Sequence, residues 1–293
     1  MHILLTGGTG FIGQALVPAL RDENHEVSVL SRSRNEESTG LRYITALDAL
    51  PSPVDAVINL AGASLAAKRW NASYKTAIRN SRLRTTSALG RYFAKRNEVP
   101  GVWLNGSAIG FYGPQDDRAL DESAANGQGF AAALCRDWEQ AARDAAPADT
   151  RLCLLRLGVV LDADGGAFAQ MAAPFRMGIG NWVASGQQFL SWIHRRDTVA
   201  AIQHLLRHDA ASGAFNLTAP NPVTSREFCA AMKRQYRTLI TLPMPAPMMR
   251  LMVGEMADEL LITGQRVLPK ALEQSGFSFS LPDIDNALAD IAA

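Results

Sequence analysis

The chain has 293 residues, 47% of them hydrophobic and 19% charged, and its formal net charge at pH 7 is +1. This composition is typical of a globular protein with a sizeable core, and it excludes an intrinsically disordered chain. A net charge so near zero gives no reason to expect nucleic acid or an anionic membrane surface as a partner.

The cysteines and the first apolar run indicate in which cellular compartment the protein is found. Cys135, Cys153 and Cys229 are odd in number and widely spaced, so neither a disulfide framework nor a zinc site is indicated. The first apolar run ends at a group of glycines and is too short for a signal peptide or a membrane span. We therefore expect a cytoplasmic protein that holds no metal and contacts no membrane.

A glycine-rich turn close to residue 1 is the most informative stretch. Residues 2–5 predict a buried strand, and helical spacing of apolar residues begins after residue 13. Strand, glycine turn and helix form the context of a dinucleotide-binding fingerprint, in which Gly7 allows the tight turn, Gly10 lets the backbone approach the pyrophosphate and Gly13 lets helix and strand pack closely. The N–H groups at the helix start would hold the phosphates. The contacts predicted from this stretch are Gly7, Thr9, Gly10, Phe11, Ile12 and Gly13.

The end of the second predicted strand, residues 26–30, indicates which coenzyme binds. An acidic residue here would bind the ribose 2′-hydroxyl of NAD. This chain instead has Ser31, Arg32, Ser33 and Arg34, and its next carboxylate is Glu36. A guanidinium and a hydroxyl can bind a 2′-phosphate that a carboxylate would repel. NADP(H) is therefore favoured, the alternative being a solvated loop with ordinary surface arginines.

The next elements continue an alternation of strands and helices. A short strand over residues 41–44 and a buried strand over 54–60 precede the small residues Ala61 and Gly62, which would let the adenosine and ribose approach the backbone. A long helix over 73–95 carries Arg82, and a strand over 102–104 leads to Ser107. A helix over 130–142 and a strand over 151–161 follow. This order predicts an α/β fold, a Rossmann-type doubly wound parallel sheet, whose strands present ligands at their carboxyl ends.

Beyond Asp162 the composition changes to glycine-punctuated runs with Met, Phe and Trp. We interpret residues 1–162 as the NADP-binding domain, to which the chain returns at about 190–219, and residues 163–189 as a lid. Residues 220–293 predict a small C-terminal domain on the substrate side, with helices over 248–261 and 265–275. His204 and His208 are four apart on a predicted helix without a third ligand, and we interpret them as surface histidines.

Several motifs resemble the extended short-chain dehydrogenase/reductases, the NAD-dependent epimerase/dehydratase group. The resemblance rests on residues 6–13, 59–62, 107–113, 192–197 and 215–217. Residues 68–71, 80–82, 135–139 and 264–270 resemble an atypical branch of that group, often labelled sugar-nucleotide epimerase or cell-division inhibitor-like. The resemblance covers essentially the whole chain. It implies NADP contacts from Ser31, Arg32, Leu60, Ala61, Arg82 and Val160. Gly62 and Ser107 are further predicted contacts, because each follows or ends a strand at the carboxyl edge of the sheet.

One departure from that family concerns the catalytic pair. Ordinary members use Tyr-x-x-x-Lys, in which a tyrosinate is the acid/base and a lysine lowers its pKa. None of the five tyrosines of this chain has a lysine four residues later, and the two positions fall on Ala131 and Cys135. The atypical branch lacks the same pair. The usual proton transfer is therefore unavailable.

Candidates for a substitute lie at the strand ends. Ser107 could orient a substrate carbonyl and Tyr112 could supply a phenol, and both are our catalytic candidates. The alternative is a strand-end hydrogen bond for Ser107 and a packed aromatic ring for Tyr112. His194 is next in line, because histidine titrates near neutral pH.

Two functions fit these observations. The first is an NADP(H)-binding oxidoreductase or epimerase-like enzyme that acts on a small carbonyl or nucleotide-sugar-type substrate. The second is a non-catalytic NADPH-binding sensor or regulatory protein, which the missing Tyr/Lys pair favours. The predicted lid and C-terminal lobe favour the enzyme, since a sensor has little need of a substrate cleft. The chain would be a monomer or a homodimer.

Overall fold

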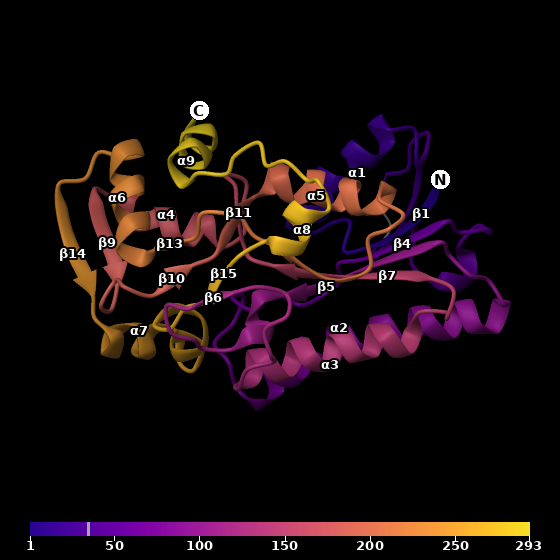
Figure 1. Cartoon of the computed structure of the whole chain (residues 1–293), viewed down its shortest axis with the longest axis horizontal. Helices are drawn as coiled ribbons and strands as arrows, with labels where there is room; N and C mark the ends of the chain where they lie inside the picture. The colour runs from indigo at the N-terminus through magenta and orange to yellow at the C-terminus, as the bar shows by residue number, and fades with distance from the viewer. Residues whose placement is uncertain (34–35) are drawn as a thin grey trace.

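A seven-stranded parallel sheet with strand order β12-β7-β5-β4-β1-β2-β3 forms the centre of the structure, a computed structural model that describes residues 1–33 and 36–293 (Figure 1). The order turns back between β1 and β4, so the sheet is doubly wound as predicted. Arg34 lies outside the described residues. The strands are β1 (His2–Thr6), β2 (Glu26–Leu30), β3 (Leu41–Ile44), β4 (Ala56–Asn59), β5 (Val102–Ala108), β7 (Arg151–Leu157) and β12 (Gly213–Leu217).

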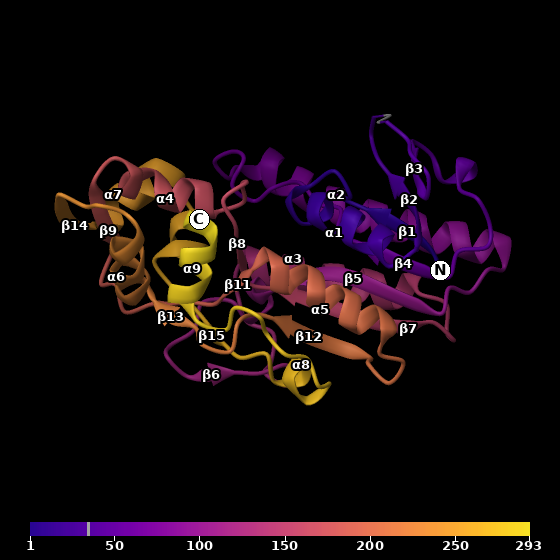
Figure 2. The ribbon, with the colours of Figure 1, turned by 90° about the horizontal axis from the view of Figure 1, so that it is seen from above.

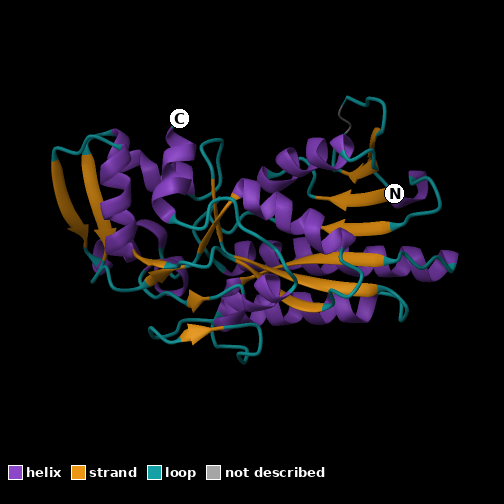
Figure 3. Ribbon diagram, turned by 45° about the horizontal axis from the view of Figure 1, so that its top comes forward, coloured by secondary structure: helices purple, strands orange, loops and turns teal. Residues whose placement is uncertain are grey.

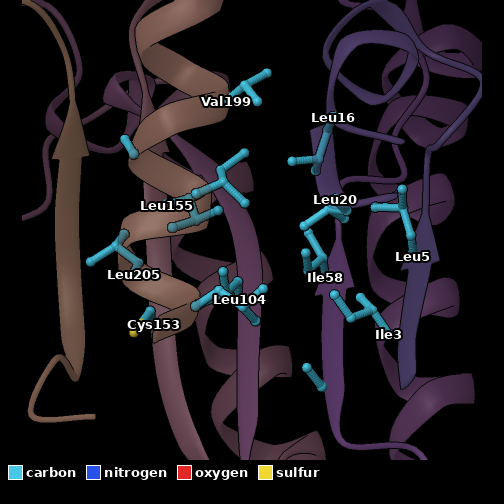
Figure 4. Packing of buried hydrophobic residues seen from close by; sticks show 14 of the residues in the cluster. Ile3, Leu5, Leu16, Leu20, Ile58, Leu104, Cys153, Leu155, Val199 and Leu205 are labelled. Carbon is cyan, nitrogen blue, oxygen red and sulfur yellow. The ribbon is translucent and has the colours of Figure 1, made fainter. Parts of the chain in front are cut away.

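Helices cover both faces of the sheet because its strands are apolar on both sides. On β1, Ile3 and Leu5 pack toward Leu16 of α1, whereas Leu4 packs toward Leu89 of α2. Figure 4 shows the first of these two layers, with Leu155 and Leu205 further along it. In Figures 1 and 2, α1 and α5 lie over one face and α2 and α3 over the other. The bounds are α1 (Phe11–Asp22), α2 (Ala72–Arg96), α3 (Phe130–Ala145) and α5 (Arg195–Arg207), with 3₁₀ turns η1 (Leu47–Ala49) and η2 (Ile109–Tyr112).

A smaller lobe lies beyond one end of the sheet and is built around its own apolar cluster (Figure 3). The segment predicted as a lid contributes α4 and β9 to it. Phe168 and Phe175 of α4 pack with Phe228 and Met232 from the C-terminal part. Its helices are α4 (Phe168–Arg176), α6 (Ser225–Gln235), α7 (Ala246–Val253), the π-helix η3 (Ala257–Leu261) and α9 (Ile284–Ala292). The short helix α8 (Lys270–Gln274) instead packs Leu272 into the main core, next to β12. The strand pairs are β9 (Ile179–Val183) with β14 (Ile240–Met244), β10 (Phe189–Leu190) with β13 (Val223–Thr224), β8 (Val159–Leu161) with β11 (Trp192–His194), and β6 (Ala119–Leu120) with β15 (Arg266–Val267).

Besides β5, which is longer than predicted, three predicted elements differ from those observed, each at a glycine or a change of partner. The strand expected over 151–161 is divided at Gly158, because β7 pairs within the main sheet and β8 pairs with β11. The helix expected over 248–261 is interrupted at Gly254, which has φ +69° and ends α7. The helix expected over 265–275 begins only at Lys270, since Arg266 and Val267 pair with β6.

Candidate functional site

The glycine turn after β1 packs closely against neighbouring main-chain atoms and forms a cradle, by which we mean the backbone surface at Gly7, Gly10 and Gly13. Gly7 has φ +77°, and a Cβ there would lie 2.8 Å from the carbonyl of Leu60. A Cβ on Gly13 would lie 2.3 Å from the Gly7 carbonyl oxygen, so a side chain is excluded at both positions. Gly10 is different, because in the described chain only the Gly7 oxygen comes within 4 Å of its built Cβ, at 3.2 Å. The space in front of Gly10 is thus open to a ligand.

The first helix presents free amide groups at this turn. Gly10 is the N-cap of α1, no side chain caps the helix within the described residues, and its first turn has no acidic residue. Its unpaired N–H groups and its dipole favour an anion at this position. Thr9 is exposed there, whereas the ring of Phe11 lies under the Arg195 guanidinium at 5.0 Å. Ile12 packs against the main core.

The carboxyl end of β2 lies next to the glycine turn, since β1 and β2 are paired through Thr6 and Leu30. Ser31 follows directly and donates its backbone N–H to the carbonyl oxygen of Ile44 at 2.9 Å. The side chain of Arg32 is exposed at this edge of the sheet. A cation on this edge can contact a phosphate on the ribose of a nucleotide held at the turn.

The carboxyl end of β4 continues the same edge on the other side of β1. The backbone N–H of Ala61 donates to Thr6 Oγ1 at 3.1 Å, which ties Leu60 and Ala61 to the start of the glycine turn. The guanidinium of Arg82 lies against Gly62, where a Cβ would be 2.8 Å from Arg82 Cζ. These residues, predicted from separate motifs, therefore meet at one edge of the sheet.

Ser107 lies within β5, which extends to Ala108 and is longer than predicted. Its side chain is 1% exposed, and its hydroxyl donates to Glu139 Oε1 at 2.8 Å. Glu139 is fully buried, and the same oxygen also accepts a hydrogen bond from Arg156 Nε at 2.8 Å. The hydroxyl of Ser107 is therefore joined to a buried ion pair, which sequence reasoning missed.

Tyr112 requires a correction. The residue is 0% exposed, its hydroxyl donates to Asn216 Oδ1 at 2.6 Å, and Arg156 Nη1 donates to that hydroxyl at 3.0 Å. Burial raises the pKa of Tyr112 above its ordinary value, although Arg156 opposes the shift. A phenol whose proton and lone pair are both used inside the protein cannot donate to a substrate in the cleft. The structure makes Tyr112 a buried structural residue, the packed aromatic ring of our alternative interpretation.

Tyr112→Phe is therefore expected to leave NADPH affinity and any turnover unchanged. The substitution removes two hydrogen bonds in a buried network, so it should lower the free energy of unfolding by about 1–3 kcal/mol. Urea denaturation and NADPH titration of the variant measure the two effects. A large loss of turnover with wild-type stability would restore the phenol as a proton donor.

The two positions of the missing catalytic pair lie on the face of α3 that meets β5. Cys135 is buried, and burial raises the pKa of its thiol to about 11, so it remains a neutral thiol at pH 7. The backbone N–H groups of Phe130 and Ala131 donate to the carboxylate of Glu259, at 2.7 and 2.8 Å. Glu259 belongs to η3 of the small lobe, 128 residues beyond Ala131, and no local pattern could have indicated this cap.

His194 and Val160 lie together where β8 pairs with β11. His194 is 3% exposed, its Nδ1 accepts the N–H of Arg196 at 3.1 Å, and its Nε2 lies 3.4 Å from Asp290 Oδ2. Burial lowers the pKa of His194 below its ordinary value. The ring caps α5 and contacts α9, which is a structural arrangement. Val160 packs against the main core.

A hollow of about 490 Å³ adjoins the N-terminus of α3. It is lined by Pro114, Gln115, Asn126, Gly127, Gln128 and Gly129. In the part of the chain that the structure describes, no group of three or more His, Cys, Asp or Glu side chains could hold a metal ion. No helix among the same residues is long and apolar enough to cross a bilayer.

Comparison with known proteins defines the class to which this fold and turn belong. Residues 3–218 match the model of the NAD dependent epimerase/dehydratase family, and residues 244–291 match a domain of unknown function, DUF1731. The chain belongs to the NAD dependent epimerase/dehydratase family.

Three proteins illustrate its relatives. An epimerase family protein of Mycobacterium bovis is 38% identical over 290 residues, which cover 98% of this chain and 96% of the relative. The crystal structure of human epimerase family protein SDR39U1 (isoform 2) with NADPH is 34% identical, has a TM-score of 0.90, and is matched over 100% of this chain and 99% of that one. A nucleoside-diphosphate sugar epimerase from Corynebacterium glutamicum is 29% identical with a TM-score of 0.77, over 100% of this chain and 58% of that one.

Proposed function

We propose that the chain binds NADP(H) along the carboxyl edge of its sheet. The observation that carries the proposal is the cradle at Gly7, Gly10 and Gly13, which is closed to side chains at two positions and open in front of the third. The NADPH in the human SDR39U1 structure, at 34% identity, supports this assignment. The proposed contacts are Gly7, Thr9, Gly10, Phe11, Ile12, Gly13, Ser31, Arg32, Leu60, Ala61, Gly62, Arg82, Ser107 and Val160.

The 2′-phosphate would be held at the end of β2. Arg32 is exposed there, and Ser31 and Arg32 stand where a carboxylate would select NAD. We expect NADPH to bind at least about tenfold more tightly than NADH, which corresponds to about 1.4 kcal/mol. Arg32→Ala should remove most of that preference, because it removes the charge-assisted contact. Calorimetric titration of both coenzymes checks this, and equal affinities in the wild-type protein would contradict it.

We propose that the bound coenzyme serves an oxidoreductase or epimerase-like reaction on a small carbonyl or a nucleotide-sugar-type substrate. When bound, NADP(H) would supply or accept a hydride. The hollow at residues 114–115 and 126–129 gives a substrate access near α3, and the Corynebacterium relative is described as a nucleoside-diphosphate sugar epimerase. Ser107 remains our candidate for orienting a substrate, but its proton is directed to Glu139, so it can accept a hydrogen bond from a substrate hydroxyl and cannot donate one to a carbonyl oxygen.

A second candidate function, a sensor or regulatory protein that binds NADPH without turnover, has one specific observation in its favour. The titratable groups at the catalytic-pair positions and on the adjacent loop are used inside the protein, since Cys135 and Tyr112 are buried and have raised pKa values. A screen of carbonyl compounds and nucleotide sugars that follows NADPH oxidation distinguishes the two functions. Turnover supports the enzyme, and NADPH binding without any turnover across the screen supports the sensor.

We further propose that the protein is cytoplasmic, and that its partner is a small-molecule substrate and neither a nucleic acid nor a membrane. The three cysteines at 135, 153 and 229 are buried free thiols, as suits a reducing compartment. Light scattering of the purified chain would decide between a monomer and a homodimer.

A further inference from the structure

Among the described residues, the guanidinium of Arg82 lies without a counter-ion against Gly62, near the carboxyl end of β4. Arg82 Nη1 donates to the carbonyl oxygens of Ala63 and Ile78, both at 3.1 Å. The guanidinium also lies over the ring of Trp138, with Cζ 5.1 Å from the ring centroid. Within residues 1–33 and 36–293, its partners are carbonyl dipoles and a π-face, and it forms no ion pair. Burial lowers the pKa of Arg82, although Cys135 and Tyr74 oppose the shift.

The carboxylates of α3 and of the neighbouring lobe are engaged elsewhere. Glu139 pairs with Arg156 at 2.8 Å, and Asp137 pairs with Arg79 at 2.8 Å. Glu259 accepts two backbone N–H groups at the start of α3. A partly buried charge without a counter-ion costs free energy in the empty protein, and such groups cluster at functional sites.

The order of the strands indicates which half of a bound coenzyme would lie next to the Arg82 guanidinium. Ser31 and Arg32, the proposed 2′-phosphate contacts, follow β2 on one side of the switch between β1 and β4. Arg82 and Gly62 lie on the other side, at the end of β4. A doubly wound sheet holds the two mononucleotides of a dinucleotide on opposite sides of that switch. We therefore place the 2′-phosphate half at Arg32 and the nicotinamide half near Arg82, so that Gly62 borders the nicotinamide half and not the adenosine expected from the sequence.

We propose that Arg82 makes the site selective for the redox state of its coenzyme, so that NADPH binds more tightly than NADP⁺. The oxidised nicotinamide ring carries a positive charge that the reduced ring lacks, and a fixed guanidinium beside it repels the oxidised form alone. The phosphates, which dominate the rest of the binding, are the same in both forms. The inference rests on the proposed NADP(H) site and deepens it. An enzyme would thereby release NADP⁺ after a reduction, and a sensor would respond to the reduced fraction.

Separate calorimetric titrations of the full chain with NADPH and with NADP⁺ test this inference. The wild-type protein should bind NADPH at least about tenfold more tightly, which raises the midpoint potential of the bound couple by about 30 mV. Arg82→Gln removes the charge and keeps an N–H donor, so the ratio of the two Kd values should fall to about one. Arg82→Lys keeps the charge and should keep most of the ratio.

Arg32→Ala is the matched control. It removes a cation from the 2′-phosphate end, which both forms share, so it should weaken both and leave their ratio unchanged. Arg82→Met is a second variant should Arg82→Gln not fold. It also removes the charge and keeps a flexible apolar side chain against the ring of Trp138, so the ratio should again fall to about one.

The outcomes separate this inference from the proposal beneath it. Equal wild-type affinities for NADPH and NADP⁺ overturn the role of Arg82 and leave the coenzyme site standing. An unchanged ratio in a folded Arg82→Gln protein assigns the selectivity to another group and overturns it too. A wild-type protein that binds neither form overturns the NADP(H) site itself.

Discussion

Gly10→Val is expected to abolish NADPH binding while the protein remains folded. Gly10 has φ −85° and ψ 177°, an extended conformation that valine adopts readily, and only the Gly7 oxygen among the described atoms lies near its built Cβ. The branched side chain would instead fill the space in front of the turn that the proposed pyrophosphate needs. The affinity should fall by at least about a hundredfold, or about 2.7 kcal/mol. Folding should lose only about 1 kcal/mol, since glycine is replaced at an N-cap.

Gly13→Ala is the control that separates the two uses of glycine. Its new Cβ would lie 2.3 Å from the Gly7 oxygen and 2.5 Å from the α-carbon of Gly8, so the backbone must move. We expect a loss of stability of more than about 2 kcal/mol, measured by urea denaturation. A folded Gly10→Val protein with wild-type NADPH affinity would show that the turn serves the fold alone.

Patterns that are local in the sequence predicted the fold well. The strand, turn and helix of residues 2–22 follow from the apolar run, the glycine spacing and the helical period, and the structure has β1 and α1 there. The parallel sheet follows from the alternation of strands and helices. The approach of Arg82 to Gly62 needed the resemblance to a family, since they are distant in the chain and only the fold brings them together.

Features that depend on distant partners were missed. Glu139 and Arg156 are separated by 17 residues and meet only once α3 packs on the sheet. The direction of Tyr112 is set by the 3₁₀ turn η2, which sends its ring toward Arg156 and Asn216 instead of the cleft. The spacing of apolar residues predicts whether a segment is a helix or a strand, but it does not predict a short 3₁₀ turn. The pattern alone therefore could not show that Tyr112 points into the protein, and its predicted catalytic role was wrong.

Glu139→Leu is expected to destabilise the protein strongly, by about 3–5 kcal/mol. The carboxylate is fully buried and accepts from Arg156 through both oxygens, at 2.8 and 3.1 Å, and from Ser107 at 2.8 Å. Its removal leaves the guanidinium of Arg156 buried without a counter-ion among the described residues. Its remaining partners there are the Tyr112 hydroxyl, the Glu122 carbonyl and the rings of Phe111 and Tyr112. The free energy of unfolding from urea denaturation measures the loss.

The double variant Glu139→Leu/Arg156→Met shows whether the loss comes from the stranded charge. Replacement of both partners by apolar side chains removes that charge, so much of the stability should return. Asp137→Ala on the same helix is the matched control, because its ion pairs with Arg79 and Arg136 are partly exposed and should contribute less than about 1 kcal/mol. A Glu139→Leu protein as stable as Asp137→Ala would mean that the buried network contributes nothing to stability. Ser107 would then be held at the end of β5 by the strand alone.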